Sequence, residues 1–155
     1  MTVIAAACAM LPDVDAIGLW YGIPYDSVFG HRGITHSCLF AGLVALAVAA
    51  PLWKRSKTGE SIRTFACVLA ATMSHGVLDA LTNGGLGVAF LAPFDDTRYF
   101  FPITPIEVSP LSARAFLTGR GFSVLWSEIG WVWCPALVVT VIARFARCRN
   151  SRSVT

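Results

Sequence analysis

Charged residues are scarce in this 155-residue sequence, where Asp, Glu, Lys and Arg together make up 14% of the chain. Hydrophobic residues make up 55%, and the mean hydropathy of +0.65 is too apolar for an ordinary water-soluble domain of this length. The five cysteines stand singly, without a CxxC pair, which argues against a disulfide framework and against a thiolate metal site. We therefore expect the chain to lie in a lipid bilayer.

Basic residues give a net charge of +3, but most of them gather in two clusters, at 54–63 and at 144–152. Both clusters flank apolar runs. An excess of Lys and Arg beside membrane spans marks the cytoplasmic side, so the clusters predict topology and do not indicate a nucleic-acid partner.

Apolar runs long enough to cross a bilayer recur along the chain. The clearest, 33–53, contains no Asp, Glu, Lys or Arg, and about 20 such residues cross a hydrocarbon core. The pattern predicts an all-α, polytopic membrane helix bundle of about four transmembrane segments, forming one integral-membrane domain over 1–155. The approximate spans are 2–20, 34–53, 62–81 and 122–143. The first is broken by Pro12, so it is either half a span or the remainder of a longer helix that starts upstream of Met1.

The two basic clusters place both termini in the cytoplasm, and the chain between the third and fourth spans outside. This outer segment, 82–121, includes the turn cluster NGGLG, a short apolar piece at 88–92 that could be re-entrant, and a proline-rich stretch. A length of about 40 residues exceeds what a connector needs. We expect the segment to form a roof over a functional site.

Histidine occurs only three times, each time in a short polar signature: twice in HRGITHS and once in SHGVLD. A third signature, LPDVD, supplies two aspartates. The predicted topology brings all three signatures to the outer side, whereas unrelated polar residues would scatter between the two faces. The convergence indicates one metal site, with the candidate ligands Asp13, Asp15, His31, His36, His75 and Asp79.

His75 and Asp79 are four residues apart, so they share one face of a helix and can bind one ion. A hydrogen-bonded pair is the alternative, but ionisable groups inside a span are costly unless they are paired or bound. Asp13 and Asp15 can face the same way from an extended or turn conformation at a helix end, and they repel each other unless a cation or solvent intervenes. Imidazoles with carboxylates fit Zn²⁺ best, with Mn²⁺ or Fe²⁺ as alternatives, and the set permits one or two ions.

HRGITHS combines a turn with a helix start. Gly33 lets the chain turn, and Thr35 can cap the helix that begins near His36. The guanidinium of Arg32 suits a phosphate, a carboxylate or an acidic partner, although Arg32 and His31 could instead meet lipid headgroups.

Glu128 lies inside the last predicted span. It either pairs with an arginine (Arg98, Arg114 or Arg120) or acts as a general base or additional ligand.

In this order, LPDVD, HRGITHS, SHGVLDALTNGG, LAPFDDTRYFFPITPIEVSP and SEIGWVW give the chain a resemblance to the bacterial membrane-bound metal-dependent hydrolases of the YdjM type. The resemblance covers nearly the whole length and implies a multi-pass protein of the bacterial inner membrane. It places the six candidate ligands at the family's polar motifs, and Arg98 and Glu128 at its later polar positions. Members usually carry a further histidine ahead of PDxD, which this sequence lacks.

The resulting hypothesis is a metal-dependent hydrolase in which metal-activated water attacks an ester or phosphoester, possibly lipid-linked, at the outer face of the membrane. Arg32 and Arg98 would hold an anionic headgroup, and Glu128 or an aspartate would take the proton. The alternative is a non-catalytic metal-binding or ion-conducting membrane protein that uses the same cluster.

Overall fold

The computed structural model describes residues 1–53, 55, 58–110, 113–117 and 119–152. Lys54 and Lys57 of the predicted basic loop, and positions 111, 112 and 118 of the predicted outer segment, lie outside the described residues. The chain forms two compact units, Met1–Thr104 and Pro105–Thr155.

The first unit opens with one continuous helical run, made of α1 (Thr2–Met10), a 3₁₀ turn η1 (Leu11–Asp15) and α2 (Ala16–Trp20). Pro12 does not end this run, because it lies at the start of η1, where its missing N–H is not needed. LPDVD, expected in an extended or turn conformation at a helix end, thus adopts a 3₁₀ turn between α1 and α2.

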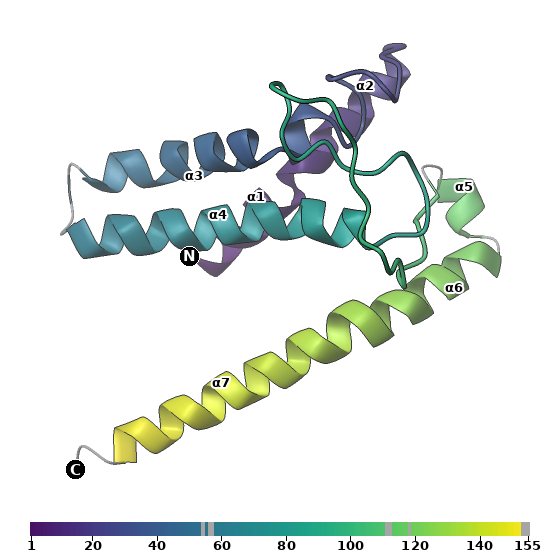
Figure 1. The fold of residues 1–155 in the computed structure, drawn as a ribbon. Coiled ribbons are helices and arrows are strands. Elements are labelled where there is room, and N and C mark those ends of the chain that lie inside the picture. Colours follow the sequence, from purple (N-terminus) through teal and green to yellow (C-terminus); the bar gives the residue numbers. More distant parts are fainter. Residues whose placement is uncertain (54, 56–57, 111–112, 118, 153–155) are drawn as a thin grey trace. The chain divides into compact units, whose positions relative to one another are not determined.

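The helices α3 (Cys38–Trp53) and α4 (Thr58–Ala80) form an antiparallel hairpin, and α1 also packs against α4 (Figure 1). The contact between α3 and α4 is built from small residues: α3 buries Ala41, Ala45 and Ala49, spaced four apart. With Cys8 of α1 and Val68 of α4, Ala45 forms the buried core of the hairpin. Small side chains let helix backbones approach closely, which is how helices associate in a membrane, where water does not drive their packing.

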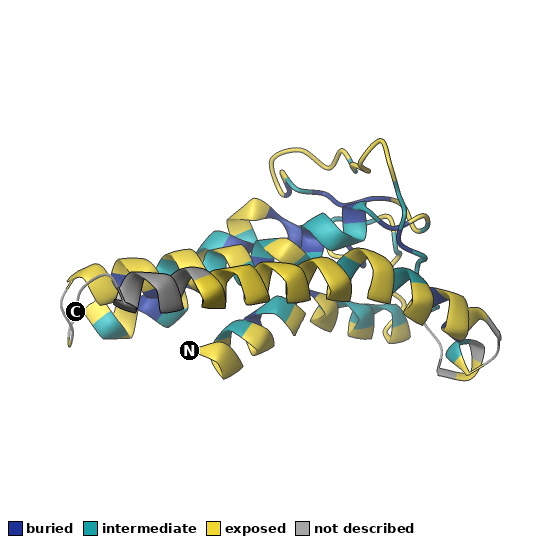
Figure 2. Cartoon of the chain, turned by 90° about the horizontal axis from the view of Figure 1, so that it is seen from below, coloured by how far each residue is buried: buried dark blue, intermediate teal, exposed yellow. Residues whose placement is uncertain are grey.

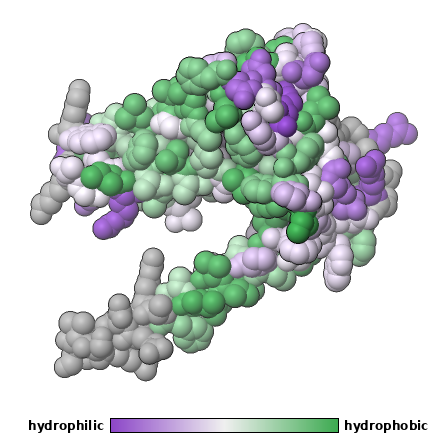
Figure 3. All heavy atoms as spheres, viewed as in Figure 1, coloured by the Kyte–Doolittle hydropathy of each residue, from purple (hydrophilic) through white to green (hydrophobic). Residues whose placement is uncertain are grey.

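Outside this narrow core the helices are exposed and apolar. Figure 2 shows much of their surface as exposed, and Figure 3 shows hydrophobic atoms over α3 and α4. Three helical runs are long and apolar enough to cross a membrane: Thr2–Trp20, Thr58–Ala80 and Arg120–Phe145. The apolar helix Cys38–Trp53 is shorter. No strand is found among the residues described, so the predicted fold class, an all-α membrane helix bundle, is confirmed.

The helix α3 begins at Cys38, later than predicted, after a separate 3₁₀ turn η2 (Ile34–His36). Its capping residue is Ser37, whose Oγ accepts a hydrogen bond from the Phe40 N–H at 3.1 Å. The expectation that Thr35 caps this helix is wrong, because the Thr35 hydroxyl donates to the carboxylate of Asp15 instead.

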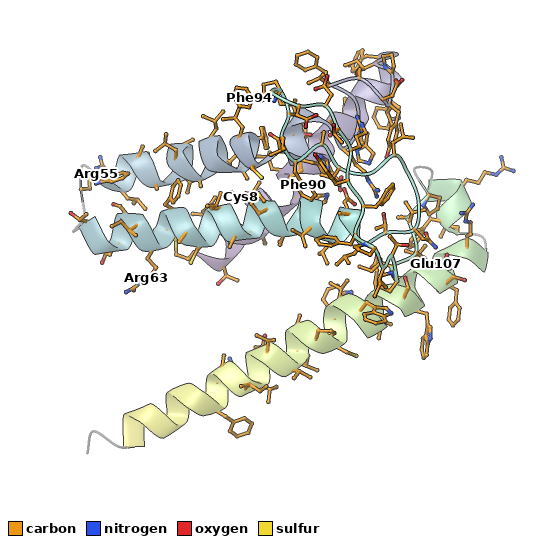
Figure 4. The ribbon with its side chains drawn as sticks, in the orientation of Figure 1. Cys8, Arg55, Arg63, Phe90, Phe94 and Glu107 are labelled. Atoms are coloured by element: carbon orange, nitrogen blue, oxygen red, sulfur yellow. The ribbon has the colours of Figure 1, made fainter. Side chains whose placement is uncertain are left out.

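The chain that follows α4, at 82–104, has no helix, and an isolated bridge joins Val88 to Tyr99. Backbone hydrogen bonds fix it to the ends of the hairpin: the Cys38 N–H donates to the Phe90 carbonyl at 2.9 Å, and the Phe101 N–H donates to the Ala80 carbonyl at 2.9 Å. This part of the predicted outer segment therefore lies against the start of α3 and the end of α4. Arg55 and Arg63 lie toward the opposite end of the hairpin (Figure 4).

The second unit is a short helix α5 (Ala113–Phe116) followed by a long helical run. That run consists of α6 (Gly119–Glu128), a π-helical turn (Ile129–Trp133, η3) and α7 (Cys134–Arg152). Glu107 precedes this run in the sequence, and its N–H donates to Ser127 Oγ of α6 at 3.0 Å.

Candidate metal centre

Three elements of the first unit meet around His36. The 3₁₀ turn η1 brings Asp13 and Asp15, η2 with the loop before it brings His31 and His36, and the last turns of α4 bring His75 and Asp79. The structure thus places all six side chains that the sequence singled out in one cluster, although Asp13 and His75, which contact each other, are 62 residues apart.

Four of these side chains direct one atom each to a common point. His36 Nε2 lies 3.1 Å from Asp79 Oδ2 and 3.8 Å from Asp13 Oδ1. His75 Nε2 lies 3.1 Å from Asp13 Oδ1 and 3.7 Å from Asp79 Oδ2. In a tetrahedral zinc site with metal–ligand distances of about 2.0–2.1 Å, neighbouring ligand atoms lie about 3.4 Å apart. The four distances lie around this value, and all four atoms lie within 4.8 Å of one another, so they are close enough together to share one ion.

The burial of two of these four atoms also fits a metal site. His36 Nε2 and Asp79 Oδ2 are buried, and neither has a hydrogen-bond partner within the described part of the chain. Buried polar atoms are normally satisfied, and these two face each other at 3.1 Å, an arrangement that suits a cation or a proton shared between them. Access differs among the ligands: the side chain of His36 is 0% exposed, that of His75 is 21% exposed, and that of Asp13 is 55% exposed.

Asp15 lies on the other side of His36 and binds protein groups only. Its Oδ1 accepts from His31 Nδ1 at 2.6 Å, and its Oδ2 accepts from the Arg32 N–H at 3.2 Å and from the Thr35 hydroxyl. The same Oδ2 lies 3.1 Å from His36 Nδ1. A carboxylate at Nδ1 fixes the tautomer of a histidine and leaves the Nε2 lone pair free for a metal.

The six predicted ligands therefore fall into four that face one point and two, Asp15 and His31, that lie on the other side of His36; whether these two bind a metal stays a prediction. A second group of possible ligand atoms exists on Asp15, His31 and His36. The carboxylate of Asp15 in this group already accepts hydrogen bonds from three donors besides His36, on His31, Arg32 and Thr35. The sequence did not reveal the contribution of Thr35, because a hydroxyl one residue before a histidine carries no signal of a distant carboxylate.

Arg32 holds Asp79 in place. Its guanidinium lies 3.0 Å from Asp79 Oδ1 and donates to the Gly84 carbonyl at 2.8 Å, and the residue is buried. Arg32 also has a φ of 64°, in the left-handed region that non-glycine residues adopt at a cost of about 1–3 kcal/mol. Surrounding contacts, including the bond from its N–H to Asp15, keep the backbone in this conformation.

The guanidinium of Arg98 donates hydrogen bonds to backbone carbonyls. Nη1 donates to His31 at 3.1 Å and to Gly87 at 3.4 Å, and Nη2 donates to Tyr25 at 3.0 Å and to Ser27 at 3.1 Å. The two arginines thus stabilise the loops around the centre. Their predicted contact with an anionic headgroup stays a prediction.

Tyr25 closes the cluster on the side of His31, with ring centroids 5.4 Å apart and the rings edge to face. Burial raises the pKa of the Tyr25 phenol above its ordinary value, so the hydroxyl stays protonated at neutral pH. Gly85, with a φ of 84°, passes close to this hydroxyl, and an added Cβ would lie 2.7 Å from it. Only glycine fits this position.

Glu128 belongs to the second unit, at the end of α6, where it is partly buried. Its predicted roles as base, additional ligand or partner of an arginine stay predictions.

Comparison with known proteins identifies the family. The YdjM inner membrane protein family matches residues 1–151. Over 131 residues the chain is 39% identical to the inner membrane protein YbcI of Escherichia coli (strain K12). The matched region covers 84% of this chain and 75% of YbcI. The chain belongs to the YdjM inner membrane protein family. No solved structure matches it.

Membership in the YdjM family confirms the resemblance and the membrane location that the sequence predicted. It also explains why large apolar side chains such as Leu43, Leu46 and Ile62 are exposed on the hairpin, because lipid covers such residues in a membrane protein. The number of crossings and the orientation of the termini stay predictions.

Proposed function

We propose that this YdjM family protein is a membrane-bound metal-dependent hydrolase that acts on an ester or phosphoester at the outer face of the inner membrane. The observation that carries the proposal is the set of four ligand atoms, on Asp13, His36, His75 and Asp79, which lie within 4.8 Å of one another and close enough to share one ion. We assign one divalent ion to it, Zn²⁺ in preference to Mn²⁺ or Fe²⁺.

The charges of the cluster support a divalent ion. Asp13, Asp15 and Asp79 contribute three carboxylates, and Arg32 contributes one guanidinium. With neutral imidazoles the cluster retains two negative charges, which one divalent cation cancels. Uncompensated charge is expensive in a partly buried site, so this balance favours a divalent over a monovalent ion.

A bound metal of this kind lowers the pKa of a water ligand and so supplies a nucleophile at neutral pH. Asp13 is the most exposed of the four ligands, so water and substrate reach the centre on its side. Its carboxylate is then the group closest to the entering water and the best placed to accept a proton from it. His36 is fixed by Asp15, and Asp79 by Arg32, so that both hold their positions while Asp13 exchanges.

One feature favours a second candidate function. Four protein ligands complete a tetrahedron, which is typical of structural zinc sites, whereas catalytic sites keep a position for water. The alternative is therefore a metal-binding membrane protein without hydrolytic activity. The exposure of Asp13 favours the hydrolase, because a carboxylate in contact with solvent is a replaceable ligand.

Turnover by zinc-loaded protein in proteoliposomes separates the two functions. We expect the wild type to hydrolyse a headgroup phosphoester or a carboxyl ester, and Asp13→Asn to lower turnover by about 10²- to 10⁴-fold, the contribution of a positioned general base. Asp26→Asn, which changes an exposed carboxylate of the loop after α2, is the control and should retain full activity. A zinc-loaded wild type that hydrolyses neither class of substrate would leave the non-catalytic function.

A further inference from the structure

A small apolar groove lies at the start of α3, outside the metal centre. It has a volume of about 250 Å³ and is lined by Cys38 and Leu39 of α3 and by residues of the segment 90–95. Apart from Asp95, the side chains that line it are apolar. Figure 4 shows Phe90 and Phe94 beside this end of α3.

The groove continues the surface of the protein that faces lipid. Leu39, Leu43 and Leu46 are exposed and follow the spacing of one helical face, so the residue that lines the groove begins an apolar stripe along α3. Leu91 and Phe94 extend the exposed apolar surface onto the segment that forms the opposite wall. In a protein of the inner membrane, this continuity identifies the occupant of the groove as lipid.

The groove also touches the elements that hold the metal ligands. Cys38 follows His36 by two residues, and its N–H donates to the carbonyl of Phe90 at 2.9 Å. The ring of Phe90 packs against Gly76, the neighbour of His75: Phe90 Cε1 lies 3.4 Å from the point where a Cβ of Gly76 would be. A chain in the groove therefore contacts Cys38 and Phe90, which connect it to η2 and to the turn of α4 that carries His75.

We propose that this groove binds an acyl chain of the substrate, and that the substrate is a membrane lipid whose headgroup region carries the bond to be cleaved. This inference rests on the hydrolase proposed above. The groove is too apolar to receive a phosphate or sugar headgroup, whereas the centre, with its metal and the exposed Asp13, suits one. In the reaction the water oxygen bonds to the carbonyl carbon or phosphorus, the bond to the leaving oxygen breaks, and that oxygen takes the proton.

The first test compares two substrates that carry the same scissile bond, a long-chain phospholipid and a water-soluble short-chain analogue. Leu39→Trp fills the groove, and we expect it to raise KM about tenfold for the long-chain lipid, the effect of losing roughly two buried methylenes, and to leave the short-chain analogue unchanged. Leu46→Trp, on the same face of α3 but away from the groove, is the matched control and should alter neither KM. An equal effect of Leu39→Trp on both substrates would overturn the inference.

The second test reads occupancy without turnover. In a variant that keeps Cys38 as its only cysteine, the exposed thiol lies in the groove, and added long-chain phospholipid should slow its alkylation by a maleimide in detergent micelles. Leu39→Trp in the same background should reduce this protection. Alkylation that lipid does not slow would overturn the acyl-chain site even if the enzyme is active, and protection that depends on protein concentration without lipid would assign the groove to a second copy of the chain. Protection by lipid in a zinc-loaded protein that hydrolyses neither substrate would refute the hydrolase and leave only a lipid site.

Discussion

Asp15→Asn tests whether the carboxylate behind His36 organises the metal centre without binding the metal. The side chain of Asp15 is 3% exposed and receives bonds from His31, Arg32 and Thr35 in addition to its contact with His36. An asparagine keeps one acceptor oxygen and presents an NH₂ group where the second oxygen was. Either His31 or His36 then faces a donor, and the tautomer of His36 that exposes the Nε2 lone pair is no longer enforced.

Two independent estimates of the effect agree. Leaving one buried donor unsatisfied costs about 1–3 kcal/mol. Loss of a carboxylate partner of a metal-bound histidine lowers metal affinity by about 10- to 100-fold, which corresponds to a similar free energy. We therefore expect Asp15→Asn to bind zinc with unchanged stoichiometry but with a Kd about 10 to 100 times higher.

The assay is competition against a chromogenic chelator in detergent, combined with elemental analysis of the purified protein. Asp26→Asn removes the same charge from an exposed residue of the loop after α2 and should leave the Kd unchanged. Unchanged affinity in Asp15→Asn would refute the positioning role. Loss of one of two bound ions would instead make Asp15 a ligand of a second metal.

Further expectations follow from the same geometry. His75→Ala should abolish stoichiometric zinc binding, measured by elemental analysis, without loss of membrane insertion, because His75 is a partly exposed side chain that contacts only the other proposed ligands Asp13 and Asp79 among the ion pairs of the described residues; one zinc per chain in the variant would contradict the ligand set. A cysteine placed at the exposed Thr97 should react with an impermeant reagent added outside, and a reporter fused after Arg152 should be cytoplasmic; labelling from the cytoplasmic side alone would invert the topology. Gly76→Ala should weaken zinc binding, because the new Cβ would lie 3.2 Å from the His36 carbonyl and displace η2, whereas Gly42→Ala on α3 meets no atom within 4 Å and should be neutral or slightly stabilising in thermal unfolding. Equal zinc affinity in the two glycine variants would show that the contact with the His36 backbone does not matter.

Composition and apolar runs were sufficient for the fold class, because a helix is the way a single apolar segment satisfies its backbone in lipid. Segment ends were harder to predict. The start of α3 depends on whether the Thr35 hydroxyl caps the helix or binds Asp15, and Asp15 comes from another part of the chain. The packing of Gly76 against η2 and Phe90 likewise depends on three separate segments and has no local signal.

The division of labour between Asp13 and Asp15 shows the same limit. The expectation from LPDVD is that the two aspartates can face the same way from an extended or turn conformation. In a 3₁₀ turn each residue advances by a third of a turn, so side chains at i and i+2 point in different directions. Asp13 consequently lies 3.8 Å from Nε2 of His36, while Asp15 lies 3.1 Å from its Nδ1. The sequence identified the aspartates, but their separate roles arise from the backbone conformation of η1.

Arg32 connects the parts of the first unit that the proposed reaction uses. Its N–H binds Asp15 in η1, its guanidinium binds Asp79 in α4, and its carbonyl accepts from the N–H of Ala89 at 3.1 Å, next to the residue that begins the groove segment. Arg32, whose backbone conformation is strained, thus contacts Asp15, which supports His36. It also contacts Asp79 and the segment that leads to the groove. A lysine could carry the charge, but its ammonium lacks the planar fork that here reaches both Asp79 and the Gly84 carbonyl. The position of the proposed metal ligands relative to the lipid-facing groove is therefore set by contacts of Arg32 that depend on its shape as well as on its charge.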